Sequence, residues 1–402
     1  MPYLIFSSTL PVLHVFLPLF TVVLLPLAAL LSAIVIRPRI SLYSPTFRKP
    51  VFYIIIFFVG YGALSGLWSV DPGRTLERAA RLVVEVVSII ILAQALLQAE
   101  YDVLMKLWRP IAVAYTAAGA LITTDLILNG LLSSFSHGGV FQNFHNRGVC
   151  ILLLVGPFIM AVAWTRGEKL FATTGAAILV CLGIFTHTAT PIFVLGIAIT
   201  VGGLVAFWPA SRFVFAVLLL VLFLAGPWLF GSILDDPILC DLIQIDDSLY
   251  HRGAIWSFVA ERIAERPILG WGLDASRAVP GADMPITQSV CPLPDRWVSR
   301  YATSLPLHPH NAALHIWLEL GVIGILCVVT ILLTILTKAV ALATSPALRF
   351  GVIATATVYV TIALMSFGVW QGWWIGSAGL VIALCIMGLR MLGQNRSVES
   401  YG

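Results

Sequence analysis

The chain changes from polar to apolar at Leu307-His-Pro-His-Asn-Ala-Ala-Leu-His-Ile-Trp-Leu-Glu-Leu-Gly-Val-Ile-Gly324. This stretch closes the longest polar interval of the sequence and opens one of its longest apolar runs. The pattern predicts a helix that begins at a membrane surface, with Pro309 in its first turn. Unpaired backbone N–H groups and the positive end of the helix dipole then lie beside His310 and Asn311, where they favour a neutral imidazole and attract anions such as phosphate.

Composition identifies the broad class of protein. Of the 402 residues, 59% are hydrophobic and 10% are charged, against about 45–50% and about 25% in soluble domains. Apolar runs of about 20 residues, long enough to span a bilayer, recur along the chain. The sequence therefore predicts an all-α polytopic membrane protein. The net charge of +4 is scattered, without the basic block that would indicate nucleic acid as a partner.

The apolar runs predict 11 or 12 transmembrane helices. The first run, Tyr3 to Ile36, contains three prolines and forms either one bent span or two short ones. The other spans are expected near 51–70, 79–98, 111–131, 148–164, 170–187, 190–207, 213–234, 313–337, 350–367 and 373–391. The chain then divides into transmembrane helices over 1–234, a long loop over 235–309, and C-terminal transmembrane helices with a tail over 310–402. The positive-inside rule places the long loop outside the membrane and the C-terminus inside.

The long loop has predicted structure of its own. Residues 253–266 form a short amphipathic helix, which Pro267 ends before a tight turn at Gly270-Trp-Gly272. One side of that helix is apolar at helical spacing, with Ile255, Trp256, Val259 and Ile263. Cys240 and Cys291 both lie in the loop, and a disulfide between them is an open alternative in an oxidising compartment.

Three histidines, His308, His310 and His315, cluster at the end of the loop. A metal site is one interpretation, but His310 and His315 are five residues apart, about 140° around a helix, whereas helical ligand pairs stand four apart. His315 and Glu319 have that spacing and are expected to pair structurally. Two interpretations of His310 remain: a histidine that caps its helix, or a general base kept neutral by the helix end.

Arginines on the predicted external side are candidate anion ligands. An arginine near a membrane interface usually extends to the headgroups or pairs with an acid. At that depth a guanidinium also binds phosphate through two parallel hydrogen bonds and offsets charge on a leaving group. Arg252 precedes the loop helix, Arg147 opens a span and Arg300 lies late in the loop.

Two acids, Glu85 and Asp125, fall inside predicted spans. Such residues are costly in a membrane and have a functional or pairing role by default. Because Arg81 lies four residues before Glu85, a structural pair within one helix is the plain explanation.

Several motifs follow one another in the order of a known family. His310-Asn311, nine residues, Gly321, two residues and Gly324 fit a signature of His, then Asn, Ser or Gln, nine residues and Gly-x-x-Gly. Further matches are Arg252 with Trp256, Pro267-x-x-Gly270-Trp-Gly272, Trp68-Ser-Val-Asp71-Pro72 and Gly139-Val-Phe141 with His145-Asn-Arg-Gly148. Over about residues 66–324 the chain resembles the O-antigen ligase and polysaccharide polymerase superfamily of bacterial envelope glycosyltransferases.

One departure bears on which branch the chain resembles. Ligases typically carry Thr-x-Ser-Arg in a hairpin between two spans, whereas this chain has Thr186-His-Thr-Ala189 and lacks the arginine. Its Thr-x-Thr-x-Thr pattern is closer to the Ser-x-Ser-x-Thr of exopolysaccharide polymerases. The departure favours a polymerase and leaves Arg147 as the candidate for the second cation.

The resemblance implies a membrane glycosyltransferase of the GT-C type in a bacterial inner membrane, with its active site facing the periplasm. It implies an undecaprenyl-diphosphate-linked oligosaccharide donor and neither metal nor other cofactor. The saccharide acceptor is a lipid-linked repeat unit for a polymerase, or the lipid A core for a ligase. Membrane lipids and chain-length or export proteins are further expected partners.

The roles expected of single residues follow from this hypothesis. His310 is the general base, and Arg252 offsets the charge of the departing lipid diphosphate. Residues expected to bind substrate share the external side: Arg147, Asn311, Asn146, His308, Arg300 and Thr188. A transporter, such as a flippase of lipid-linked oligosaccharides, is the alternative from another class, and it predicts internal repeat symmetry that this sequence does not show. A non-catalytic subunit of polysaccharide assembly is a third interpretation.

Overall fold

The computed structural model describes residues 2–38, 50–131, 145–186, 188–232, 247–285 and 303–399. Cys240, Cys291, His187 and Arg300 lie outside these ranges, so the disulfide and the position of Arg300 stay predictions. Within the ranges the secondary structure is helical throughout, with no β-strand, which confirms the all-α fold. Nine of the described helices are long and apolar enough to cross a membrane, as a multi-pass membrane protein requires.

The first apolar run forms two helices, α1 (Pro2–Phe16) and α2 (Thr21–Ile36), joined by the 3₁₀ turn η1 (Pro18–Phe20). Pro18 disfavours a helical backbone at the residue before it, which ends α1 there. The helices that follow are α3 (Pro50–Leu64), η2 (Ser65–Leu67), α4 (Pro72–Gln98), α5 (Tyr101–Ile127), α7 (Asn146–Thr165), α8 (Lys169–Phe185) and α9 (Ala189–Phe207).

The single span predicted near 213–234 is wrong. The chain there forms α10 (Ser211–Leu224) and a short α11 (Gly226–Gly231), and the break falls at Gly226-Pro227. With 14 residues, α10 is shorter than the roughly 20 needed to cross a bilayer. The remaining elements are α13 (Asp247–Glu265), η4 (Ser276–Ala278), α15 (Ala312–Leu342), α16 (Pro346–Met365) and α17 (Gly372–Glu399).

Helix α7 is the centre of the bundle. Its residues from Gly148 to Ile159 are all buried, and it packs against α5, α8 and α16. A helix that is apolar on every side belongs in the interior of a bundle. Its first turn therefore has a fixed position, and that turn carries Arg147.

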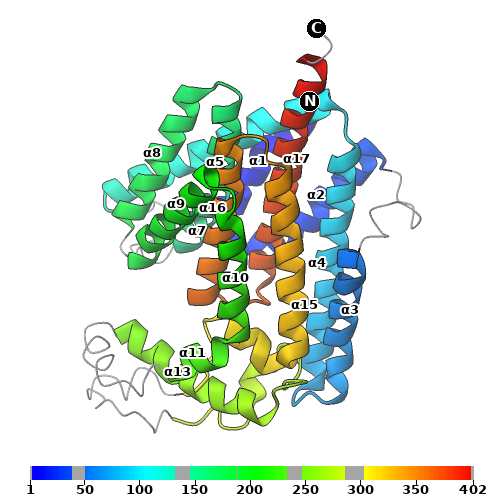
Figure 1. Ribbon diagram of the computed structural model, residues 1–402, viewed down its shortest axis with the longest axis vertical. Helices are drawn as coiled ribbons and strands as arrows, with labels where there is room; N and C mark the ends of the chain where they lie inside the picture. The colour runs from blue at the N-terminus through cyan, green and yellow to red at the C-terminus, as the bar shows by residue number, and fades with distance from the viewer. Residues whose placement is uncertain are drawn as a thin grey trace.

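Helices α11 and α13 lie at one end of the bundle, opposite the end where α1 begins and α17 ends (Figure 1). Helix α13 begins six residues before the predicted start at 253. Its predicted apolar side is buried, as expected, and it packs on α11 and α15. Helix α13 therefore covers one side of the N-terminal end of α15.

Helix α15 contains a break at Gly321, where φ is +61° and ψ is −162°. Only glycine adopts this backbone conformation readily. The turn after α13 fills the break, because the N–H of Trp271 donates to the carbonyl of Leu318 and the N–H of Gly272 to that of Glu319, both at 2.9 Å. The glycine turn predicted at 270–272 is therefore docked against the signature helix by backbone hydrogen bonds.

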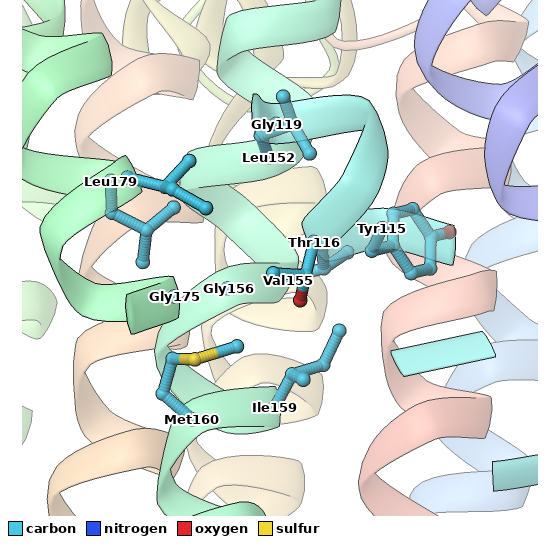
Figure 2. Close-up of a pocket in the computed structure, with 11 residues that line it drawn as sticks. Tyr115, Thr116, Gly119, Leu152, Val155, Gly156, Ile159, Met160, Gly175 and Leu179 are labelled. Carbon is cyan, nitrogen blue, oxygen red and sulfur yellow. The ribbon is translucent and has the colours of Figure 1, made fainter. Parts of the chain in front are cut away.

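A small apolar cavity lies between α5, α7 and α8, lined in part by Gly119, Gly156 and Gly175 (Figure 2). Its volume is about 20 Å³, far below the roughly 300–1,000 Å³ of ligand pockets. None of the predicted site residues lines it. We interpret it as a packing gap between small residues.

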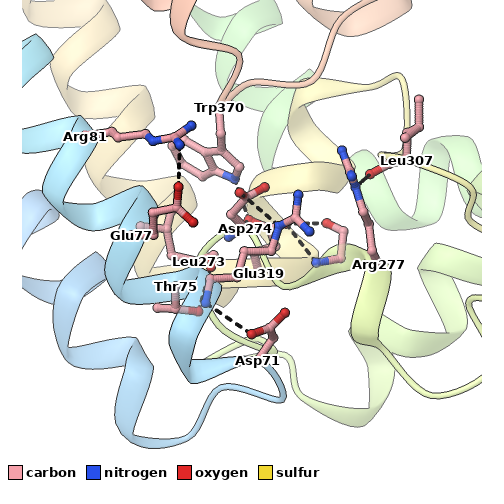
Figure 3. Close-up of polar contacts among 12 residues, drawn as sticks. Asp71, Thr75, Glu77, Arg81, Leu273, Asp274, Arg277, Leu307, Glu319 and Trp370 are labelled. Atoms are coloured by element: carbon pink, nitrogen blue, oxygen red, sulfur yellow. Dashed lines mark hydrogen bonds and ion pairs between the residues drawn. The ribbon is translucent and has the colours of Figure 1, made fainter.

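The acids inside the spans have partners, but one predicted partner is wrong. Glu85 pairs with Arg78, seven residues before it. Arg81 pairs instead with Glu77 (Figure 3). Glu77 and Glu85 are each four residues from Arg81, so the spacing fits either acid as its partner. The buried Arg78 lies on the same helix, α4, and pairs with Glu85. Asp125 accepts from His145 at 2.7 Å.

Candidate active site

Helix α15 begins later than the sequence predicts. Asn311 is its N-cap, and the side-chain Oδ1 accepts from the N–H groups of Ala313 and Leu314 at 3.0 and 3.2 Å. A short side-chain oxygen is what an N-cap requires. The expectations that Pro309 lies in the first turn and that His310 can be the cap are therefore both wrong.

His310 has a left-handed backbone conformation, with φ at +55°. Its Nδ1 lies 2.7 Å from the carbonyl oxygen of Ser366. A carbonyl only accepts, so Nδ1 carries the proton and Nε2 keeps a lone pair. This is the tautomer in which Nε2 acts as a base.

The surroundings of His310 favour its neutral form. Burial lowers the pKa of His310 below its ordinary value, the Ser366 carbonyl opposes that shift, and the charges of Arg252 and His315 add to it. A neutral imidazole near neutral pH is the form that a general base needs.

His308 supports the backbone of His310. The two ring centroids are 4.2 Å apart, and the N–H of His310 donates to Nδ1 of His308 at 3.2 Å. Burial, followed by the charges of neighbouring residues, lowers the pKa of His308 to about 2. It therefore stays neutral and holds the turn before α15.

Arg252 lies within electrostatic reach of His310. The charge of Arg252 contributes to the lowered pKa of His310 and to that of His251, which falls to about 4 mainly through burial. Trp256, one turn further along α13, donates its indole N–H to the carbonyl of Pro309 at 2.8 Å. Residues four apart share one side of a helix, so Trp256 anchors the side of α13 that carries Arg252.

Arg147 is connected to the histidines through Trp373 and Gln371. Its guanidinium carbon is 5.8 Å from the ring centroid of Trp373, and the Trp373 indole donates to Oε1 of Gln371 at 2.8 Å. The amide nitrogen of Gln371 is 3.3 Å from Nε2 of His308. A continuous set of contacts therefore joins Arg147 to the histidines, and no ion pair between described residues involves Arg147.

The three other residues predicted to bind substrate have no described contact with His310. Asn146 is the first residue of α7, beside Arg147. Thr188 is exposed just before α9, and in the described part of the chain no hydrogen bond or ring contact links it to the histidines. Arg300 lies outside the described residues.

The histidine nitrogens do not converge as metal ligands. Nδ1 of His310 is bound to Ser366, Nδ1 of His308 accepts from a backbone N–H, and Nε2 of His315 is paired with Glu319 at 3.1 Å. The predicted structural pair of His315 and Glu319 is thus confirmed. Over the described ranges no three His, Cys, Asp or Glu side chains form a metal-binding group.

Sequence reasoning missed three contributors: Ser366 and Gln371 in the connection between α16 and α17, and Trp373 in the first turn of α17. In the sequence they stand in Ser366-Phe-Gly-Val-Trp-Gln-Gly-Trp373, a short break between two apolar runs. The polar side chain of Gln371, placed between two apolar runs, was the feature of the sequence that could have indicated a role for this segment. Their roles depend on contacts to residues more than fifty positions away, which the sequence does not reveal.

Comparison with known proteins supports the resemblance over part of the chain. Residues 174–329 match the family model described as O-antigen ligase. Three Rickettsia proteins that share the name "Putative polysaccharide ligase" align with the chain. Those of Rickettsia conorii and Rickettsia felis are 36% identical over 139 residues and 34% identical over 137 residues, in each case 34% of this chain and 31% of the relative. That of Rickettsia typhi is 24% identical over 254 residues, 62% of this chain and 59% of its own length.

These alignments span less than two thirds of each relative. The family match covers the glycine turn, the signature histidine and the first part of α15. The chain is thus a multi-pass membrane protein whose residues 174–329 match the O-antigen ligase family.

Proposed function

We propose that this protein is a membrane glycosyltransferase that moves a saccharide from an undecaprenyl-diphosphate donor to a sugar hydroxyl, with inversion and without a metal. The observation that carries the proposal is the state of His310, a partly buried imidazole near Arg252. Its Nδ1 binds the Ser366 carbonyl, and its Nε2 has no hydrogen-bond partner among the described residues. A base for the attacking hydroxyl and a cation for the leaving diphosphate are the two groups that this transfer needs.

In the proposed reaction Nε2 of His310 takes the proton of the acceptor hydroxyl. The hydroxyl oxygen bonds to the anomeric carbon of the donor as the bond from that carbon to the diphosphate oxygen breaks. The electron pair passes to the lipid diphosphate, and Arg252 and Arg147 stabilise its charge. Nδ2 of the buried Asn311 has no hydrogen-bond partner among the described residues, and we propose that it donates to a substrate oxygen once the donor is bound.

Two observations point to different acceptors. The hairpin at Thr186–Ala189 lacks an arginine, which favours a polymerase that uses a lipid-linked repeat unit. The names of the Rickettsia relatives favour a ligase, for which the acceptor is the lipid A core. We take the polymerase as the first candidate and the ligase as the second.

A deletion strain of the host distinguishes the two. Lipopolysaccharide and secreted polysaccharide are separated on gels, and the strain is complemented with the wild-type gene. Single repeat units that accumulate on the lipid carrier, with loss of long polysaccharide, are expected for a polymerase. Long chains on the carrier beside a bare lipid A core would identify a ligase, and an unchanged polysaccharide profile would contradict both.

We place the site at the periplasmic face of the inner membrane. Short connections rich in basic residues face the cytoplasm by the positive-inside rule. Arg166 lies in one such connection, between α7 and α8, and Lys169 is the first residue of α8. The buried acids do not favour the transporter alternative. Glu85 is paired with Arg78 and Asp125 with His145, so structural pairing accounts for both.

The pH dependence of transfer follows from the environment of His310. A general base works in its unprotonated form, and a lowered pKa keeps that form present at lower pH. Because burial lowers the pKa of His310 from the ordinary 6.5, we expect kcat/KM to stay constant as pH falls from 8 and to decline only below 6.5. The measurement is the initial rate of transfer in proteoliposomes between pH 4.5 and 8. A decline that begins above pH 6.5 would contradict the assignment.

Arg252 is expected to contribute to both donor binding and turnover. Arg252→Ala should lower kcat/KM about a hundredfold, and Arg252→Lys about tenfold because lysine keeps the charge without the two-pronged geometry. Glu261→Ala, an exposed change on the same helix, is the control and should leave transfer unchanged. Equal rates for the wild type and Arg252→Ala would remove this residue from the mechanism.

A further inference from the structure

Glu319 is fully buried, and its carboxylate accepts hydrogen bonds from three separate parts of the chain. Figure 3 shows Glu319 beside two of these partners, Asp274 and Trp370. The donors are the N–H of Asp274 at 2.6 Å, the N–H of Ser276 at 3.1 Å and its hydroxyl, Nε2 of His315 at 3.1 Å, and the indole N–H of Trp370. A buried carboxylate is costly unless its oxygens are satisfied. This one joins α15 to the segment after the glycine turn and to the connection between α16 and α17.

The connection from Ser366 to Gln371 is the same segment that holds the candidate base. Its Ser366 carbonyl accepts the Nδ1 proton of His310. Its Trp370 donates to Glu319, and its Val369 N–H donates to Nδ1 of His315 at 3.3 Å. The hydrogen bond from Trp370 reaches Glu319 directly, and the one from Val369 reaches it through His315, whose Nε2 donates to the same carboxylate.

We infer that Glu319 is a positioning residue for the proposed reaction: it fixes the 366–371 connection so that the Ser366 carbonyl holds His310 with Nε2 free. This inference rests on the proposed role of His310. The carboxylate does not touch the reacting atoms. It acts through the placement of one carbonyl, and a misplacement of about 1 Å costs up to about a hundredfold in rate.

Two neighbours of Glu319 allow the positioning role to be separated from a merely structural one. Trp370→Phe removes the hydrogen bond from the connection that carries Ser366. Ser276→Ala removes a hydrogen bond to the same carboxylate from the opposite segment. A structural role predicts similar consequences for both changes, whereas a positioning role predicts slower turnover for Trp370→Phe alone.

The variants are compared by kcat and by the KM for donor, measured on purified protein. Glu319→Gln lowers kcat at least about tenfold while the KM for donor stays within about twofold, because only the placement of the base changes. Trp370→Phe lowers kcat about fivefold, and the double variant is no slower than Glu319→Gln, as expected for residues that act in one path. Ser276→Ala keeps the wild-type kcat.

The assay uses proteoliposomes and the lipid-linked saccharide that accumulates in the deletion strain. Rates are normalised to the monodisperse folded fraction. The inference is overturned if folded Glu319→Gln has the wild-type kcat, or if Ser276→Ala slows turnover as much as Trp370→Phe. If Glu319→Gln does not fold, the comparison of those two variants decides. Wild-type turnover by His310→Asn would instead show that the base assignment itself is wrong, and the inference would fall with it.

Discussion

His310→Asn is expected to lower turnover by about 10²–10⁴-fold, the usual contribution of a general base. Nε2 of His310 is the nitrogen with a free lone pair, because Nδ1 is bound to the carbonyl of Ser366. The change removes the base and leaves the proposed phosphate ligands, Arg252 and Arg147, in place. The loss should therefore appear in kcat, with little change in the KM for donor.

Asparagine is the informative replacement at this position. Its amide N–H can take the place of Nδ1 and keep the hydrogen bond to Ser366. Asparagine also tolerates the left-handed backbone that His310 adopts at φ +55°, whereas alanine there costs about 1 kcal/mol or more. His310→Asn thus separates loss of the base from loss of structure better than His310→Ala.

Transfer by the two variants is measured in proteoliposomes beside their thermal unfolding in detergent. We expect His310→Asn to unfold near the wild-type temperature and to be as inactive as His310→Ala. If His310→Asn retained a tenth or more of the wild-type turnover, another group would have to take the proton, and the proposed mechanism would be wrong.

The parts of the fold that were predictable depend on local patterns. Apolar runs of bilayer length gave most of the spans. The recurrence of Ile255, Val259 and Ile263 correctly gave the buried side of α13, since helical periodicity is a property of neighbouring residues. The candidate site was likewise predicted from a local feature, the short signature that begins at His310.

What the sequence could not reveal depends on choices between nearby alternatives or on distant contacts. Pro309 suited a first helical turn, yet Asn311 caps the helix because its side-chain oxygen satisfies two N–H groups. Arg81 had two acids within reach along its helix and pairs with Glu77. The carbonyl of Ser366 binds His310 across 56 positions of sequence, and no local pattern encodes such a contact.

Gly321→Ala is expected to destabilise the protein by about 3 kcal/mol or more. Gly321 has φ at +61°, and a Cβ built on it would lie 2.1 Å from the carbonyl oxygen of Ile268. That oxygen belongs to the backbone of the turn after α13, so it cannot move aside as a flexible side chain would. Alanine must either expel the turn from the break in α15 or straighten the helix.

Either response removes the hydrogen bonds from the turn to the carbonyls of Leu318 and Glu319, so Gly321→Ala should also lose transfer activity. Gly203→Ala is the matched control, because Gly203 lies inside α9 with no atom within 4 Å of an added Cβ. Thermal unfolding in one detergent, with transfer measured on the same samples, compares the two. The control should match the wild type in both measurements. Equal stability of the two variants would mean that the turn does not hold the break open, and the spacing of the glycines in the signature would then need another physical cause.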